Sequence, residues 1–139
     1  MTLEELEHTL PNGLHDSEVQ SIQIDYVERR ATMQVCVFVG DVDAPLERRE
    51  AYREGLLVIS GLLFAAIEPP DASYPFAKPR NLRVDACDKK KDLDPSLISS
   101  LPAGSFVRSL FVDEWNSFVH LAGLDAEMLW KDQGTITYR

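Results

Sequence analysis

Cysteine is scarce in this chain, and no hydrophobic run is long enough to cross a bilayer. The two cysteines, Cys36 and Cys87, lie far apart, each inside a segment with a strand-like pattern. The N-terminal residues MTLEELEHTL contain neither a basic stretch nor an apolar one, so no secretory signal is visible. The longest apolar run covers residues 56–67, which is shorter than the roughly 20 residues that a membrane-spanning helix needs. We therefore expect a soluble, cytoplasmic protein with reduced thiols.

Positive charge is also in short supply. The 139 residues include 14 Lys and Arg against 23 Asp and Glu, which gives a net charge of −9. Such a surface repels phosphate backbones and anionic lipid headgroups, so we expect binding neither to nucleic acid nor to membranes. The same charge suits solubility, or a basic protein partner.

The sequence lacks the motifs that identify common catalytic and cofactor sites. It contains no glycine-rich phosphate loop, no G-x-S-x-G elbow, no H-E-x-x-H motif and no C-x-x-C pair. Asp41-Val42-Asp43 has the form of a calcium loop at its start, but Ala44-Pro45 follows where further oxygen ligands are required. We accordingly predict no cofactor, no metal and no catalytic residue, which favours a protein that is not an enzyme.

Two short helices are predicted from their capping residues. Thr2 and Glu5 form a capping-box pattern, and leucines follow at helical spacing until Pro11 ends the segment. Asp94 precedes Pro95 in the manner of an N-cap before the first helical position, so a second helix of about two turns should follow.

Most of the remaining chain has the alternating pattern of β-strands. The expected strands cover residues 22–26, 33–39, 81–88 and 106–112, followed by one long strand from Phe118 to Trp130 that bends at Gly123. A helix over residues 125–131 is the alternative for the end of that strand.

Residues 46–67 are ambiguous between strand and helix. Their charged first half is rich in helix formers, but Gly55 and Gly61 would each cost about 1 kcal/mol inside a helix. We favour two buried strands that break near Gly61. Together these elements predict one domain, residues 1–139, of the α+β class, with a mainly antiparallel, curved sheet of about six strands and two short helices.

Two histidines are candidate ligand or pocket residues. His15-Asp16 is the kind of dipeptide through which HD phosphohydrolases bind metal, but those enzymes need further histidines and an aspartate spread over a helical bundle. The structural alternative is that Asp16 caps the turn before the first strand, with His15 beside it. His120 lies on an otherwise apolar strand face, where it is either a buried base in a pocket or a core histidine bonded to a backbone carbonyl.

Aromatic and acidic residues indicate a candidate surface for a partner. Tyr74 and Phe76 belong to a proline-rich loop, and Trp115 lies in a predicted turn beside Asp113 and Glu114. Aromatic anchors within an acidic rim are typical of protein interfaces. The alternative is that the rings fold back over the sheet as a lid and that the two carboxylates are only solvated.

The opening and the end of the chain resemble those of several uncharacterised bacterial domain families. The resemblance is carried by Gly13-Leu14-His15-Asp16-Ser17-Glu18-Val19 before the first hairpin, and by the segment from Asn116 to Trp130. Some of these small acidic domains are similar to immunity proteins found beside polymorphic toxins. The resemblance implies an α+β fold with a curved antiparallel sheet, and it carries over no catalytic residue.

Three functional hypotheses follow from these observations. The first is an acidic, immunity-type domain that binds a basic protein. The second is a small-molecule-binding protein or enzyme with a pocket on the concave face of the sheet, lined by His120 and aromatic residues. The third is a homodimer formed through strand edges, without a ligand.

Overall fold

The computed structural model describes residues 1–76, 82–88 and 93–139, with the backbone alone for residues 86–88. In chain order the elements are α1 (Leu3–His8), β1 (Pro11–Leu14), β2 (Glu18–Asp25), β3 (Arg30–Phe38), the 3₁₀ turn η1 (Leu46–Arg48), β4 (Ala51–Ser60), β5 (Phe64–Ile67), β6 (Leu82–Asp88), α2 (Pro95–Ser99), β7 (Phe106–Val112), β8 (Ser117–Gly123), β9 (Asp125–Trp130), the 3₁₀ turn η2 (Lys131–Gly134) and β10 (Ile136–Tyr138). The α+β class with an antiparallel sheet and two short helices is confirmed. Neither helix in the described part of the chain is long and apolar enough to cross a membrane.

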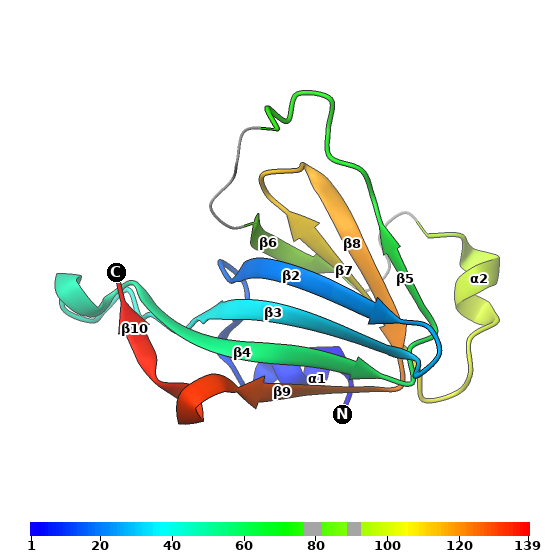
Figure 1. Ribbon diagram of the computed structural model, residues 1–139, viewed down its shortest axis with the longest axis horizontal. Coiled ribbons are helices and arrows are strands. Elements are labelled where there is room, and N and C mark those ends of the chain that lie inside the picture. Colours follow the sequence, from blue (N-terminus) through cyan, green and yellow to red (C-terminus); the bar gives the residue numbers. More distant parts are fainter. Residues whose placement is uncertain (77–81, 89–92) are drawn as a thin grey trace.

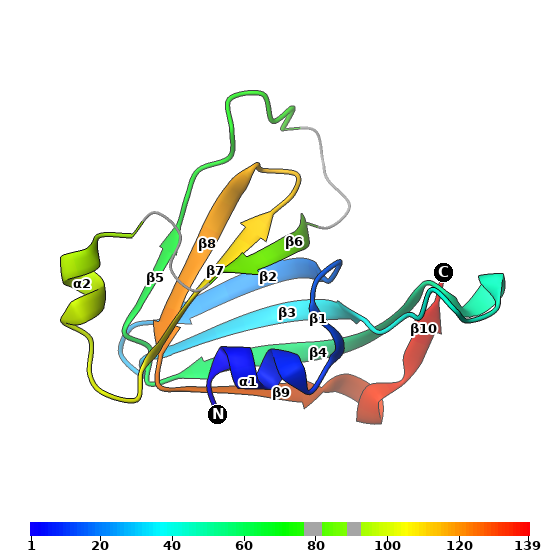
Figure 2. The ribbon, with the colours of Figure 1, turned by 180° about the vertical axis from the view of Figure 1, so that it is seen from behind.

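One strongly bent antiparallel sheet organises the molecule. Its strand order is β10-β4-β3-β2-β6-β7-β8-β5, and β9 pairs with β4 beside this path. Strands β2, β3, β4 and β9 run side by side as one half, whereas β6, β7, β8 and β5 rise from it as a second half (Figure 1). Viewed from behind, α1 lies over β4 and β9 on the inner side of the bend (Figure 2).

The core fills the inner side of this bend. Buried side chains from both halves of the sheet and from α1 meet in one cluster, which comprises Leu3, Leu6, Leu14, Val19, Ala31, Met33, Val35, Val37, Leu57, Ile59, Leu62, Val84, Phe106, Leu110, Val112, Val119, Leu121 and Ala126. Helix α1 enters it through Leu3 and Leu6, and the expected capping box is confirmed. The Thr2 hydroxyl accepts from the Glu5 amide at 3.1 Å, and the Thr2 amide donates to the Glu5 carboxylate at 2.8 Å.

The prediction of about six strands is wrong, since the described residues form nine strands in the sheet. One additional strand arises at Leu124, which interrupts the long strand predicted from Phe118 to Trp130. Before the break, β8 buries the odd positions Val119 and Leu121 in the core, and after it β9 buries the even position Ala126. The chain thus passes from β8, paired with β7 and β5, to β9, paired with β4 in the other half of the sheet.

The ambiguous segment forms two strands, as expected, and Gly61 at the break adopts a positive φ of 60°. The expectation that both strands are buried is wrong for β5, an edge strand whose residues are half-buried or exposed. Strand β4 nevertheless begins at Ala51, so it includes charged residues that are also good helix formers. Successive residues of a strand point to opposite faces of the sheet, so each charged side chain finds its own partner. The Arg53 guanidinium lies 3.9 Å from the centre of the Trp130 ring, whereas Glu54 pairs with Lys131 at 3.0 Å. Strand β10, which pairs with Ala51–Arg53, was not predicted at all.

Candidate functional site

The turn that carries His15 and Asp16 joins β1 to β2 and is fastened to β6. Asp16 has a positive φ of 62°, a conformation that aspartate tolerates better than most residues. Its amide donates to the carbonyl of Val84 at 2.8 Å, and the Val84 amide donates to the carbonyl of Ser17 at 2.8 Å. These two bonds fix the position of the turn against the middle of β6.

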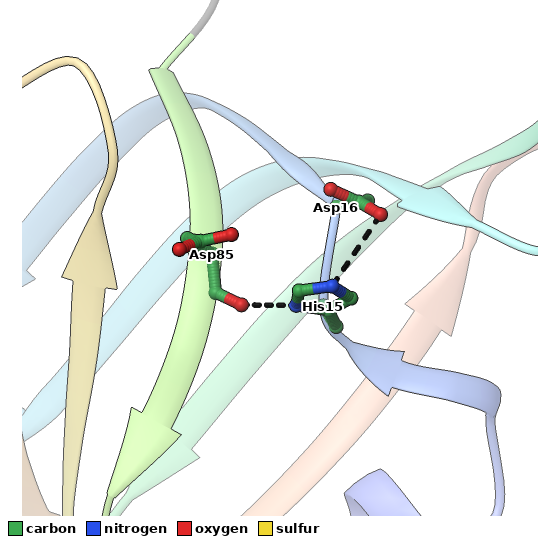
Figure 3. A group of neighbouring side chains, drawn as sticks. All are labelled: His15, Asp16 and Asp85. Carbon is green, nitrogen blue, oxygen red and sulfur yellow. Dashed lines mark hydrogen bonds and ion pairs between the residues drawn. The ribbon is translucent and has the colours of Figure 1, made fainter.

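This attachment brings His15 and Asp16 next to Asp85 of β6 (Figure 3). The His15 ring contacts the main-chain carbonyl oxygen of Asp85 through Nδ1, and its Nε2 lies 3.5 Å from Asp16 Oδ2. One ligand atom from each of the three side chains lies within 4.8 Å of the others. The register of β6 against β7 shifts between Val84 and Ala86, which is a bulge that gives Asp85 its place outside the regular ladder.

Arg83 connects this cluster to the turn between β7 and β8. Its guanidinium lies 4.0 Å from Asp16 Oδ1 and 3.5 Å from Asp113 Oδ2, and its amide donates to Glu114 Oε1 at 2.5 Å. Burial alone would lower the pKa of Arg83, but the hydrogen bond to Asp113 and the charges of the neighbouring carboxylates raise it overall. The two acidic residues expected at a partner surface, Asp113 and Glu114, therefore lie beside the His15–Asp16 turn.

The loop after β5 is fastened to the same β7–β8 turn. The Asp71 amide donates to the carbonyl of Trp115 at 2.8 Å, and the side chain of Asn116 donates to the Asp71 carboxylate at 3.2 Å. Hydrogen bonds from the Ser73 amide, the Asn116 side chain and the Ser73 hydroxyl lower the pKa of Asp71. The carboxylate is therefore charged at neutral pH and holds the loop in place.

The three aromatic residues predicted for a partner surface differ in their surroundings. Trp115 is partly buried and packs against the core, as the lid alternative proposed. Tyr74 and Phe76 instead contact each other edge to face, with ring centres 4.9 Å apart, and 73% of Phe76 is exposed. Phe76 therefore presents an uncovered ring to solvent within the described part of the chain.

These contacts join four segments into one surface, which we call the acidic end. It consists of the carboxylates of Asp16, Asp71, Asp85, Asp113 and Glu114 together with the aromatic pair Tyr74 and Phe76. The segment after β5 forms the protruding loop above the β7–β8 turn in Figure 1. The sequence identified most of these residues singly, but their hydrogen-bonded connection through Arg83 and Asp71 had no sequence signal.

His120 lies elsewhere, on the face of β8 opposite to the core residues Val119 and Leu121. Both of its ring nitrogens have partners: the Ser109 hydroxyl lies 2.7 Å from Nδ1, and the Glu68 carboxylate lies 2.9 Å from Nε2. Phe118 stacks on the ring, and its amide donates to the other Glu68 oxygen at 2.8 Å. Both ring nitrogens of His120 are therefore satisfied within the protein, by the Ser109 hydroxyl and the Glu68 carboxylate.

The network contains the residue types of a Ser-His-acid catalytic triad, but its serine is buried, whereas the serine of a catalytic triad has to be accessible to the substrate. Ser109 is 0% exposed, so its oxygen is out of reach of a substrate. The network instead ties the loop after β5 to the middle of β7 and β8. On the concave side of the sheet, the residues around Met33, Leu110 and Val119 enclose a cavity of only about 10 Å³, which is close to the minimum for one water molecule.

Two further groups in the interior are an ion pair, which the sequence did not predict, and the thiol of Cys36, which was expected to be reduced. The Arg108 guanidinium on β7 donates to the Glu7 carboxylate on α1 at 2.6 Å, and the ion pair joins a buried carboxylate to a partly buried guanidinium. Cys36 is a buried free thiol, and burial, with the nearby charges of Glu54 and Glu18, raises its pKa. A thiol with a raised pKa is a poor nucleophile, which argues for a structural role. The side chain of Cys87 lies outside the described residues.

Comparison of the chain with protein-family models, with curated proteins and with solved structures finds no match. The function therefore has to be inferred from these sites alone.

Proposed function

We propose that this protein binds another protein and that the partner presents a basic surface to the acidic end. The observation that carries the proposal is the convergence, from four separate segments, of five carboxylates and an aromatic pair in which Phe76 is exposed. Hydrogen bonds and ion pairs within the protein already hold most of these groups in place. A surface that is organised before binding loses less conformational freedom when the partner arrives.

The charge of the acidic end supports a basic partner. Among the described residues, the cations at these carboxylates are the Arg83 guanidinium and, when it is protonated, the His15 ring. Several carboxylates are therefore left without a full counter-charge, on a protein whose net charge is −9. An excess of this kind accelerates the encounter with a positive surface, and salt screens it over about 8–10 Å at ordinary ionic strength.

The aromatic pair supplies the apolar contact that such an interface needs. Charged groups at the rim of an interface mostly set the association rate and the orientation, whereas buried aromatic side chains contribute most of the affinity. Phe76, exposed beside Tyr74, is placed to enter an apolar pocket of the partner. An immunity-type role, in which the partner is a basic toxin or enzyme, is the form of this function that the sequence resemblance favours.

The test is affinity capture from a lysate of the cells that produce the protein, at low and at moderate salt. A C-terminal tag leaves the α-amino group of Met1 free to pair with Asp125, as it does in the structure. Wild-type protein is compared with the double variant Asp113→Lys/Glu114→Lys and with Phe76→Ser. The matched control is Glu28→Lys/Glu47→Lys, which makes the same charge change at two exposed residues outside the acidic end.

We expect one basic protein in stoichiometric amount, released as salt rises, retained by the control and lost from both acidic-end variants. Equal retention by the acidic-end variants would show that the partner binds elsewhere and would contradict the proposal. An empty eluate from the wild type at both salt concentrations would also count against it, and would favour the small-molecule hypothesis.

A further inference from the structure

We infer that His15, Asp16 and Asp85 form a binding site for a divalent transition-metal ion, with zinc the best match to the ligands. This inference does not rest on the proposed partner binding. It departs from the sequence-based expectation of no metal because the sequence showed only the first two ligands. The third, Asp85, comes from β6, 70 positions after His15.

The hydrogen-bond roles at His15 provide the first argument. The main-chain oxygen of Asp85 can only accept, so the Nδ1 atom that contacts it must carry the proton. In the neutral ring, Nε2 then has a lone pair, and this lone pair lies 3.5 Å from an oxygen of the Asp16 carboxylate, which is also an acceptor. Two acceptors at this separation repel each other unless a positive species lies between them. A metal ion bound by both atoms is one arrangement that removes this repulsion, and the spacing of the ligands supports it.

The spacing fits the metal ion. Zinc lies about 2.0–2.1 Å from a histidine nitrogen and about 2.0–2.2 Å from a carboxylate oxygen, so two ligands of a tetrahedral site are about 3.4 Å apart. The 3.5 Å between His15 Nε2 and Asp16 Oδ2 is close to this value, and it exceeds the usual length of a hydrogen bond. An Asp85 carboxylate oxygen lies within 4.8 Å of a carboxylate oxygen of Asp16 and of one ring nitrogen of His15, so the third ligand type is at hand beside this pair. Metal-binding histidines commonly donate their other N–H to a backbone carbonyl, as His15 does here.

The neighbouring charges leave this place available to a cation. Arg83 approaches Asp16 through Oδ1, which leaves Oδ2 directed at His15. Nothing in the described part of the chain donates to the Asp85 carboxylate, although the residue is half-buried.

The ligand types decide which ion is favoured. An imidazole nitrogen with two carboxylates suits zinc and, more weakly, manganese, whereas magnesium and calcium prefer sites made of oxygen alone. His15 is 57% exposed on its side chain, so water or an external group can complete the coordination. Such a metal would join the β1–β2 turn to β6 across the bend of the sheet.

The test is zinc titration of the full-length protein at pH 7.5, after removal of metals by chelator and dialysis. Calorimetry gives the affinity and stoichiometry. Long-range ¹H–¹⁵N NMR of the three histidines reports the protonation state of each ring nitrogen. The variants are His15→Ala and Asp85→Asn. The matched controls are His8→Ala, an exposed histidine on α1, and Glu127→Gln, an exposed carboxylate on β9.

We expect one zinc ion per chain, a shift of the His15 ring signals alone, and affinity reduced at least about tenfold in both variants but unchanged in the controls. Magnesium at the same concentration should leave the His15 signals in place. The inference would be overturned if His15 is doubly protonated at pH 7.5 and stays so in excess zinc. Binding of zinc at His8 and His15 alike, with Asp85→Asn unaffected, would show an adventitious ion only and would equally reject the site.

Discussion

Replacing Glu7 by leucine should destabilise this protein by about 3 kcal/mol, because the substitution leaves the guanidinium of Arg108 buried without its main counter-charge. Glu7 is 7% exposed on α1, Arg108 is 13% exposed on β7, and their contact of 2.6 Å joins the helix to the sheet. Removing one partner of a buried ion pair typically costs about 3–5 kcal/mol. The lower value applies here because the pair is only part-buried.

The thermal consequence follows from the size of the chain. An unfolding entropy of roughly 2.1 cal/mol/K per residue gives about 0.3 kcal/mol/K for 139 residues. A loss of about 3 kcal/mol should therefore lower the melting temperature by about 10 °C. The exposed pair between Glu54 and Lys131 provides the control, since Glu54→Leu should change stability by no more than about 1 kcal/mol.

A double-mutant cycle shows whether the cost comes from the unpaired charge. Arg108→Met alone should also destabilise, because it leaves the Glu7 carboxylate buried, whereas Glu7→Leu/Arg108→Met replaces the pair by apolar groups and should cost much less than the sum of the two. Urea unfolding of the four proteins measures all the terms. The reasoning would be refuted if Glu7→Leu cost less than about 1 kcal/mol, or if the two single effects simply added.

Two further predictions concern strand β8 and the loop after β5. Burial raises the pKa of Glu68, but hydrogen bonds from His120 and the Phe118 amide lower it overall from the ordinary 4.5, so the charged carboxylate stabilises the fold above that pH. The Glu68→Gln variant should therefore have a lower melting temperature than wild type at pH 7, and this difference should shrink as pH falls below 4.5. A difference in melting temperature that stays constant from pH 7 to pH 3 would contradict this assignment. The substitution Gly123→Ala would place a Cβ 2.5 Å from Ile59 Cγ2. It should therefore lower the free energy of unfolding, measured in urea, by about 1–3 kcal/mol. An unchanged free energy of unfolding would mean that Ile59 can move aside.

Local signals in the sequence predicted the fold where the structure depends on neighbouring residues. The capping box at Thr2 and the N-cap at Asp94 set the starts of both helices, and the alternating pattern located the hairpin of β2 and β3. The end of the chain was harder because both sides of β8 are buried, so its alternation carries little information about which face meets the core. The change of core-facing positions across Leu124 follows from pairing with β4, which is set by contacts distant in sequence.

The candidate site was predictable only residue by residue. Phe76, Asp113 and Glu114 were identified from residue type and turn context, and all three are exposed. Arg83, which holds Asp113 and Glu114 next to Asp16, had no recognisable pattern around it, because its role depends on the pairing of β6 with β2 and β7. Asp85 was missed for the same reason, and a search for metal ligands by spacing along the chain cannot find a pair that the bent sheet brings together.

The distribution of charge within the described residues gives the reason to place function at the acidic end. Two polar networks in the interior are internally paired: Glu7 has Arg108, and His120 has both of its nitrogens bonded within a network that includes Glu68. Networks of this kind stabilise the arrangement of helix and strands but offer nothing to a ligand. At the acidic end the carboxylates outnumber the described cations, and they are exposed or half-buried. Unmatched charge of one sign destabilises a folded protein through self-repulsion, and that repulsion is relieved when a cation or a basic partner binds there.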